Sequence, residues 1–88
     1  MQEFKTLVRL LNIGPGEISF TFERGKPKFD DGLHEFCDNV SRLQEKLEEG
    51  RHTIKDTWTR QSIVYNGLRF IEKYNEALKD YFKKRRNN

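Results

Sequence analysis

The residues best suited to catalysis or metal binding are one cysteine and two histidines, and their spacing supports neither activity. His34 and Cys37 are three residues apart and would be neighbours on a helix, where a Cys–His pair can form a nucleophilic thiolate. Cys37 also borders an apolar stripe, however, and a thiol in that position is usually inert packing. We therefore expect Cys37 to be structural and the protein not to be an enzyme.

Metal and cofactor sites have equally little support. His34 and Asp38, four residues apart, offer two ligands, whereas a closed zinc site needs about four. His52 is the only other histidine. The turn Gly14-Pro15-Gly16 lacks the strand, the further glycines and the lysine at fixed offset that a phosphate-binding loop requires. We expect no metal ion and no cofactor.

A basic cluster near the carboxyl end is the strongest chemical signal in the chain. Its members are Lys79, Lys83, Lys84, Arg85 and Arg86. Each could neutralise a phosphate, and upstream side chains could stack on single-stranded bases: Trp58, Arg60, Tyr65 and Arg69. Cations near a helix C-terminus are favoured by the helix dipole in any case, and a nucleic-acid footprint is usually more one-sided than a net charge of +3. Nucleic-acid binding is thus the alternative function.

The element that must position most of these residues is a long helix, predicted from Thr53 to Arg86. Thr53 and Asp56 have the form of a capping box at its start. Two neighbouring stripes of mostly apolar residues run along it with helical spacing. The first stripe is Val64, Leu68, Ile71, Asn75, Leu78 and Phe82, and the second is Ile63, Gly67, Phe70, Tyr74, Ala77 and Tyr81. Together they form a face too wide for one narrow partner helix to cover.

Two features of this helix allow more than one interpretation. Asn75 interrupts the first stripe, where a single polar residue commonly fixes register or oligomeric state, or it simply lies at the edge of the face. Residues 57–65 are rich in β-branched and aromatic side chains, and Asn66-Gly67 is a strong hairpin signal. We favour the helix because its period runs unbroken from Val64 to Phe82.

A second helix is predicted over residues 31–49. Its apolar residues follow a seven-residue pattern: Leu33, Phe36, Val40, Leu43 and Leu47. Asp30 and Asp31 are suited to cap its start, and Gly50 is suited to end it in a turn over residues 50–52. The two helices would then pack antiparallel, with the first stripe of the long helix against this pattern.

The first thirty residues are expected to supply the β structure. Residues 2–12 fit either a short helix or a strand, and we favour the helix because its basic residues then share one side. Strict alternation of apolar and polar residues predicts a strand over residues 17–23. A turn over residues 24–27 would lead to a short edge strand at Lys28 and Phe29, because a proline precedes it.

Composition limits the size of the core. The chain has 88 residues, of which 34% are hydrophobic and 35% charged, although 12% aromatic residues partly compensate. Dimerisation would enlarge so thin a core. A single cysteine excludes an intramolecular disulfide, and no apolar run approaches the roughly 20 residues that cross a bilayer. We expect a cytoplasmic protein that does not contact membranes.

These observations predict one small α+β domain over residues 1–88, in which a β-hairpin or strand packs on an antiparallel pair of amphipathic helices. A short N-terminal helix is an optional addition, and residues 83–88 would form a basic, frayed tail. We expect a small non-catalytic protein–protein interaction module, such as an adaptor, assembly subunit or inhibitor of a larger machine, that self-associates as a homodimer. Exposed aromatic and arginine side chains would contact the partner: Trp58, Arg60, Arg69, Tyr74 and Tyr81.

Overall fold

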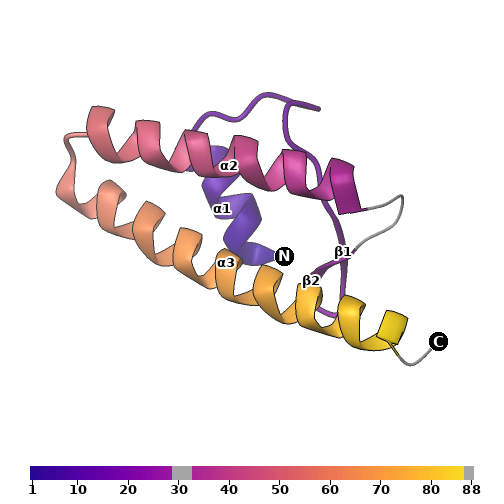
Figure 1. The fold of residues 1–88 in the computed structure, drawn as a ribbon. Coiled ribbons are helices and arrows are strands. Elements are labelled where there is room, and N and C mark those ends of the chain that lie inside the picture. Colours follow the sequence, from indigo (N-terminus) through magenta and orange to yellow (C-terminus); the bar gives the residue numbers. More distant parts are fainter. Residues whose placement is uncertain (29–32, 87–88) are drawn as a thin grey trace.

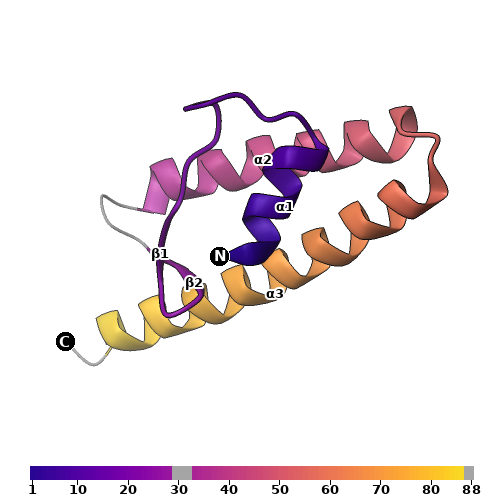
Figure 2. The ribbon, with the colours of Figure 1, turned by 180° about the vertical axis from the view of Figure 1, so that it is seen from behind.

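The computed structural model describes residues 1–28 and 33–86 and has the predicted α+β architecture (Figure 1). Helix α2 (Leu33–Thr53) and helix α3 (Thr57–Arg86) form a long antiparallel pair joined by a short loop. Helix α1 (Gln2–Leu10) and the hairpin of strands β1 (Thr21–Glu23) and β2 (Lys26–Lys28) cover one side of this pair, as the two opposite views show (Figures 1 and 2). The other side stays open.

An aromatic cluster joins α1, the hairpin and both long helices. The ring of Phe4 on α1 lies 5.1 Å from that of Phe20, 5.6 Å from that of Phe22 and 5.9 Å from that of Phe70 on α3. Phe20 also contacts Phe36 of α2, with ring centroids 5.6 Å apart. Fully buried aliphatic side chains extend the core beside these rings: Leu7, Leu43 and Ile63. Aromatic residues thus provide much of the buried area that the sparse aliphatic residues cannot.

The hairpin is shorter than the alternation predicts. Strand β1 has three residues and pairs antiparallel with β2, with Phe22 opposite Pro27. The turn is Arg24-Gly25 alone, and both residues have positive φ, as a tight two-residue hairpin turn requires. The predicted turn over residues 24–27 is therefore wrong, because its last two residues belong to β2. Phe29 lies outside the described residues.

The predicted end of the first long helix is also wrong. Helix α2 continues through Gly50 to Thr53. A Cβ atom at Gly50 would lie 2.7 Å from Cδ2 of Leu11, so the glycine allows the end of α1 to approach the helix closely. The predicted caps of this helix, Asp30 and Asp31, lie outside the described residues.

Helix α3 begins at Thr57, four residues later than the capping-box pattern predicts. Asp56 is the cap: its Oδ2 accepts hydrogen bonds from the backbone N–H of Thr59 at 2.8 Å and from the Thr59 hydroxyl at 2.6 Å. The Thr53 hydroxyl instead donates to the carbonyl of Glu49, within α2. The hairpin alternative for residues 57–70 is wrong, since all of them are helical.

The second stripe of α3 faces the core. The prediction that the first stripe does so is wrong. Ile63 and Phe70 are fully buried and Ala77 nearly so, whereas Leu68 is 62% exposed and Val64 is 40% exposed. We call the second stripe the inner stripe and the first the outer stripe. Helix α1 decides between them, because it packs against α3 and places Phe4 and Leu7 beside Phe70.

Candidate functional site

A groove between α2 and α3 opens on the side that α1 and the hairpin leave uncovered. We call it the α2/α3 groove; its volume is about 450 Å³. Its lining residues are Gln44, Leu47, Glu48 and Arg51 of α2 and Ile63, Val64, Gly67, Leu68 and Ile71 of α3. Gly67 lets the helices approach, because a Cβ atom there would lie 3.1 and 3.3 Å from the two Cδ atoms of Leu47. The floor of the groove is apolar.

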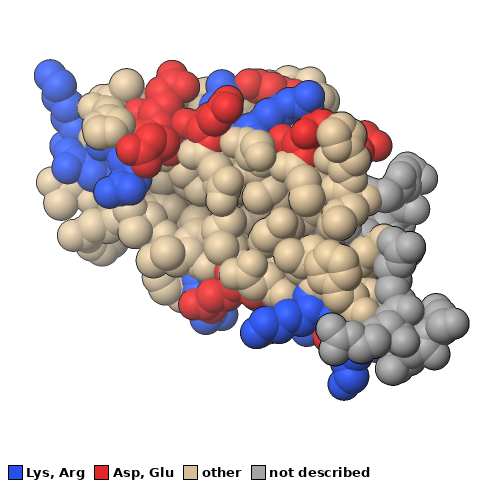
Figure 3. All heavy atoms as spheres, in the orientation of Figure 1, with Lys and Arg blue, Asp and Glu red and all other residues tan. Residues whose placement is uncertain are grey.

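The outer stripe continues this apolar surface towards the carboxyl end of α3. Leu68 and Val64 line the groove, and Phe82, 47% exposed, lies further along the helix. Ile71 and Leu78 are half-buried, and Asn75 is exposed. In the space-filling view, a broad uncharged face lies between a charged row along α2 and charged side chains along α3 (Figure 3). An uncharged face with exposed apolar side chains and a charged rim is typical of an interaction surface.

The charged rim of the groove on α2 is already paired. Oε2 of Glu48 lies 3.4 Å from Nη1 of Arg51, and its Oε1 lies 3.0 Å from Nε2 of His52. All three side chains are more than half exposed, so these pairs contribute little to stability. Paired charges at the rim leave apolar contact as the main interaction that the groove itself can offer.

The structure places two of the predicted partner contacts at the start of α3. Trp58 is 81% exposed, the most open of the large hydrophobic side chains among the described residues, and does not line the groove. Arg60 is turned back onto the loop before α3, where its Nε donates to the carbonyl of Ile54 at 3.1 Å and its Nη2 donates to that of Lys55 at 3.3 Å. Arg60 thus has a structural role in holding the α2–α3 loop.

Tyr74 is half-buried against the core, and is therefore less exposed than the sequence predicts. Its ring stacks on Phe36 at 5.3 Å with an interplanar angle of 11°, and its hydroxyl lies 4.0 Å from Sγ of Cys37. Burial, and then the contact with Cys37, raise the pKa of Tyr74. Cys37 therefore meets a tyrosine of the core, and the structure gives it no contact with His34, which is 95% exposed beside Asp38.

The remaining predicted contacts lie on other faces of α3. The guanidinium of Arg69 is 4.0 Å from the carboxylate of Glu72. Tyr81 is half-buried, with its ring 5.5 Å from that of Phe82, and it faces the hairpin rather than the groove. The five predicted partner contacts are therefore spread over several surfaces, and none of them lines the α2/α3 groove. The sequence signal for the groove was the excess width of the apolar face.

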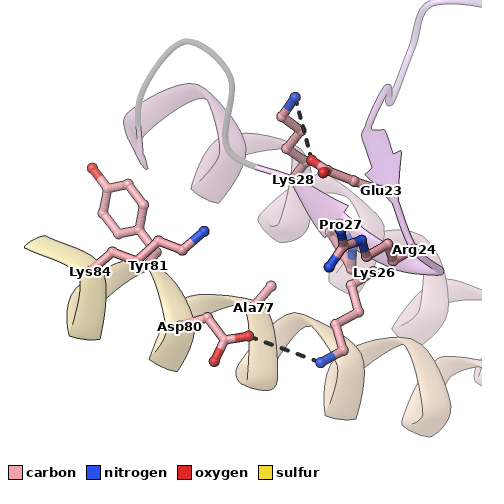
Figure 4. Close-up of a pocket in the computed structure, with 9 residues that line it drawn as sticks. All are labelled: Glu23, Arg24, Lys26, Pro27, Lys28, Ala77, Asp80, Tyr81 and Lys84. Carbon is pink, nitrogen blue, oxygen red and sulfur yellow. Dashed lines mark ion pairs between the residues drawn. The ribbon is translucent and has the colours of Figure 1, made fainter.

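A second hollow, of about 420 Å³, lies between the hairpin and the end of α3 (Figure 4). Basic side chains from both elements line it: Arg24, Lys26 and Lys28 from the hairpin and Lys84 from α3. Lys26 reaches the carboxylates of Glu76 and Asp80 at 3.2 and 4.0 Å, and Lys28 lies 3.5 Å from Glu23. The predicted basic cluster does not include the hairpin, although basic residues at positions 24, 26 and 28 are a sequence signal for its contribution.

The predicted basic cluster is only partly described. Lys79, Lys83 and Lys84 are exposed on α3, which extends through Arg86. The side chains of Arg85 and Arg86, like residues 87–88, lie outside the described part of the chain.

Within residues 1–28 and 33–86, no three His, Cys, Asp or Glu side chains gather in a way that could hold a metal ion. Over the same residues, no helix combines the length and the apolar character needed to span a bilayer. Comparison with models of known protein families, with curated proteins and with solved structures gave no match to the chain.

Proposed function

We propose that this protein is a non-catalytic interaction module that binds a protein surface with the open face of its α2–α3 pair. One observation carries the proposal: the outer stripe presents Leu68 at 62%, Phe82 at 47% and Val64 at 40% exposure on one uncharged face. Completing the burial of such side chains is worth up to roughly 1.5–3 kcal/mol each, before the costs of association are subtracted. The face therefore has enough apolar surface to hold a partner.

Photo-crosslinking at a single position tests this proposal. A photoreactive amino acid replaces Leu68 in the full chain, and in a matched variant it replaces Tyr65, which is equally exposed at 62% but does not line the groove. Both variants are irradiated in cells that normally make the protein. Discrete protein adducts at position 68 that are missing at position 65 support the proposal. No adducts at position 68, or the same adducts at both positions, would refute it.

Nucleic-acid binding is the second candidate, favoured by the hollow between the hairpin and α3. Arg24, Lys26, Lys28 and Lys84 outnumber Glu23 and Asp80 in its lining. Phosphate groups of a nucleic acid are the anions that such a basic surface can neutralise.

A salt titration with mixed single- and double-stranded nucleic acid tests the second candidate. The double variant Lys83→Gln and Lys84→Gln should bind more weakly, and its affinity should depend less steeply on salt. The matched control is Lys55→Gln, an exposed lysine in the α2–α3 loop. Absence of binding by the wild-type chain at low salt would exclude this function.

A further inference from the structure

We propose that a second copy of this chain covers the α2/α3 groove, with the outer stripes of two α3 helices packed side by side. The inference rests on the proposed function, because it names the partner of the same face. It follows from the spacing of the outer stripe, the size of the face and the position of Asn75.

The outer stripe has the spacing of a coiled-coil contact. Its six residues succeed one another at steps of four, three, four, three and four, which is the heptad pattern of helices that pack along their length. The inner stripe is used within the chain, where it contacts α2 and α1. A two-fold dimer buries the same patch on both subunits, and a stripe of this kind is complementary to itself.

The face is large enough for a stable dimer. The stripe from Val64 to Phe82 spans about 27 Å at 1.5 Å per residue. The molecule is 48 Å long, so the stripe runs along more than half of its length, and a contact that also covers the α2/α3 groove can approach the roughly 800 Å² that each partner buries in a standard interface. Its uncharged character (Figure 3) suits an equally uncharged surface, which the second copy supplies.

Asn75 determines how the two helices align. If they run antiparallel about the centre of the stripe, Asn75 faces Ile71 of the partner subunit, and its amide loses water without gaining a hydrogen bond. If they run parallel and in register, Asn75 faces Asn75 of the partner subunit, and the two amides can bond to each other. The geometry therefore favours the parallel alignment.

This alignment brings the two basic ends together. Lys79, Lys83 and Lys84 of both subunits then lie at the same end of the dimer, where they repel each other. Salt screens this repulsion but leaves apolar contact intact. Dimer affinity should therefore increase with salt, whereas binding to nucleic acid would decrease.

Sedimentation equilibrium of the full chain from low to high micromolar concentration is the first test. We expect the wild-type chain to reach the mass of two 10.6 kDa chains. Leu68→Glu should weaken association about 100-fold or more, because it would bury an unpaired charge. The control variant Trp58→Glu adds the same charge at an 81% exposed side chain that precedes the stripe and does not line the groove, and it should remain dimeric. Circular dichroism confirms that both variants are folded.

Disulfide cross-linking tests the alignment. In a Cys37→Ser background, Phe82→Cys places one thiol near the end of the outer stripe. A parallel dimer brings the two thiols together, and mild oxidation should join the chains. A centred antiparallel dimer separates them by about 27 Å, so a dimer that sediments normally but does not cross-link would overturn the alignment.

The outcomes separate this inference from the proposed function. A wild-type chain that stays monomeric at all concentrations, or a Leu68→Glu variant that still dimerises, would overturn the second-copy inference. If photo-crosslinking at position 68 still captures a different protein, the proposed function stands without it. If position 68 yields neither self-association nor any adduct, both fail.

Discussion

Asp56 is the residue that starts α3, through its two hydrogen bonds with Thr59. Asp56→Ala removes the acceptor for an otherwise unpaired N–H at the helix start, so it should lower the melting temperature. Thr53→Ala is the matched control, because the Thr53 hydroxyl donates to Glu49 within α2 and should matter less. Thermal unfolding followed by circular dichroism measures both. An equal effect of the two variants would contradict the assignment of Asp56 as the cap.

The carboxyl group of Asp56 also makes the stability of the protein depend on pH, in a direction that follows from its pKa. Hydrogen bonds from the hydroxyl and the backbone N–H of Thr59 lower the pKa of Asp56 below its ordinary value of 3.8. Its contribution to stability is therefore complete above that value and is lost as the pH falls through the lowered pKa. The difference in melting temperature between the wild type and Asp56→Ala should shrink towards zero in strong acid.

Lys73 and Glu3, which are seventy residues apart in the sequence, join α3 to α1. The Nζ atom of Lys73 donates to both carboxylate oxygens of Glu3, at 3.1 and 3.2 Å, and the two side chains are 28% and 15% exposed. Lys73→Met should cost about 1 kcal/mol of unfolding free energy, because it leaves a mostly buried carboxylate without its partner. Lys79→Met, at an exposed site, is the control. Urea denaturation measures both, and equal midpoints would show that the pair does not hold α1.

Acid should remove what this ion pair contributes. The pKa of Glu3 is lowered from its ordinary value of 4.5, first by a hydrogen bond from its own backbone N–H and then by Lys73. Stability from Glu3 is therefore complete above that value and declines as the pH falls through the lowered pKa. The difference between the wild type and Lys73→Met should disappear over the same range.

Local sequence patterns predict helix ends correctly only where no residue from a distant segment packs against them. Gly50 has the sequence context of a helix end, yet α2 continues through it because Leu11 fills the space beside the missing Cβ. The contact joins residues 39 positions apart, so no local pattern could reveal it. The sequence predicts a capping box that contains both Thr53 and Asp56, and it does not show that α2 extends to Thr53 and leaves Asp56 as the cap.

At the level of elements, helix α3 has one apolar face that is buried in the core and one that is exposed at the surface. Phe70 on the inner stripe is fully buried, whereas Leu68 on the outer stripe is 62% exposed. Phe70→Ala should cost about 3–5 kcal/mol, since it leaves a cavity in the core. Leu68→Ala should change the stability of the monomer by less than about 0.5 kcal/mol. Chemical denaturation at a concentration that dissociates any dimer distinguishes them, and similar costs would contradict the assignment of the two stripes.

Both stripes of α3 could be predicted from the sequence, but the sequence does not show which of them faces the core. Each has helical spacing and similar composition, so periodicity alone does not identify the stripe that faces the core. The position of α1 decides, because Phe4 and Leu7 pack beside Phe70 and so turn the inner stripe inward. The same packing leaves Tyr74 half-buried against the core and the outer stripe at the surface, so the sequence predicts the site only in part.

At the level of the whole molecule, the two sides of the α2–α3 pair are unequal. Helix α1 and the hairpin cover one side, where the aromatic cluster lies (Figure 2). The opposite side presents the α2/α3 groove and the outer stripe, and its charges lie at the rims (Figure 3). Val64, Leu68 and Phe82 remain exposed on this open side, which is the observation on which the proposed binding of a protein rests.

The most direct test observes that face as the chains associate. Methyl NMR spectra of the wild-type chain are recorded from low to high micromolar concentration, with the indole of Trp58 as an internal control because it is 81% exposed outside the groove. We predict that the methyl resonances of Val64, Leu68 and Ile71 shift and lose solvent contact as concentration rises, while the Trp58 indole is unchanged. If those methyl groups stay solvent-exposed at every concentration, the second copy does not cover this face.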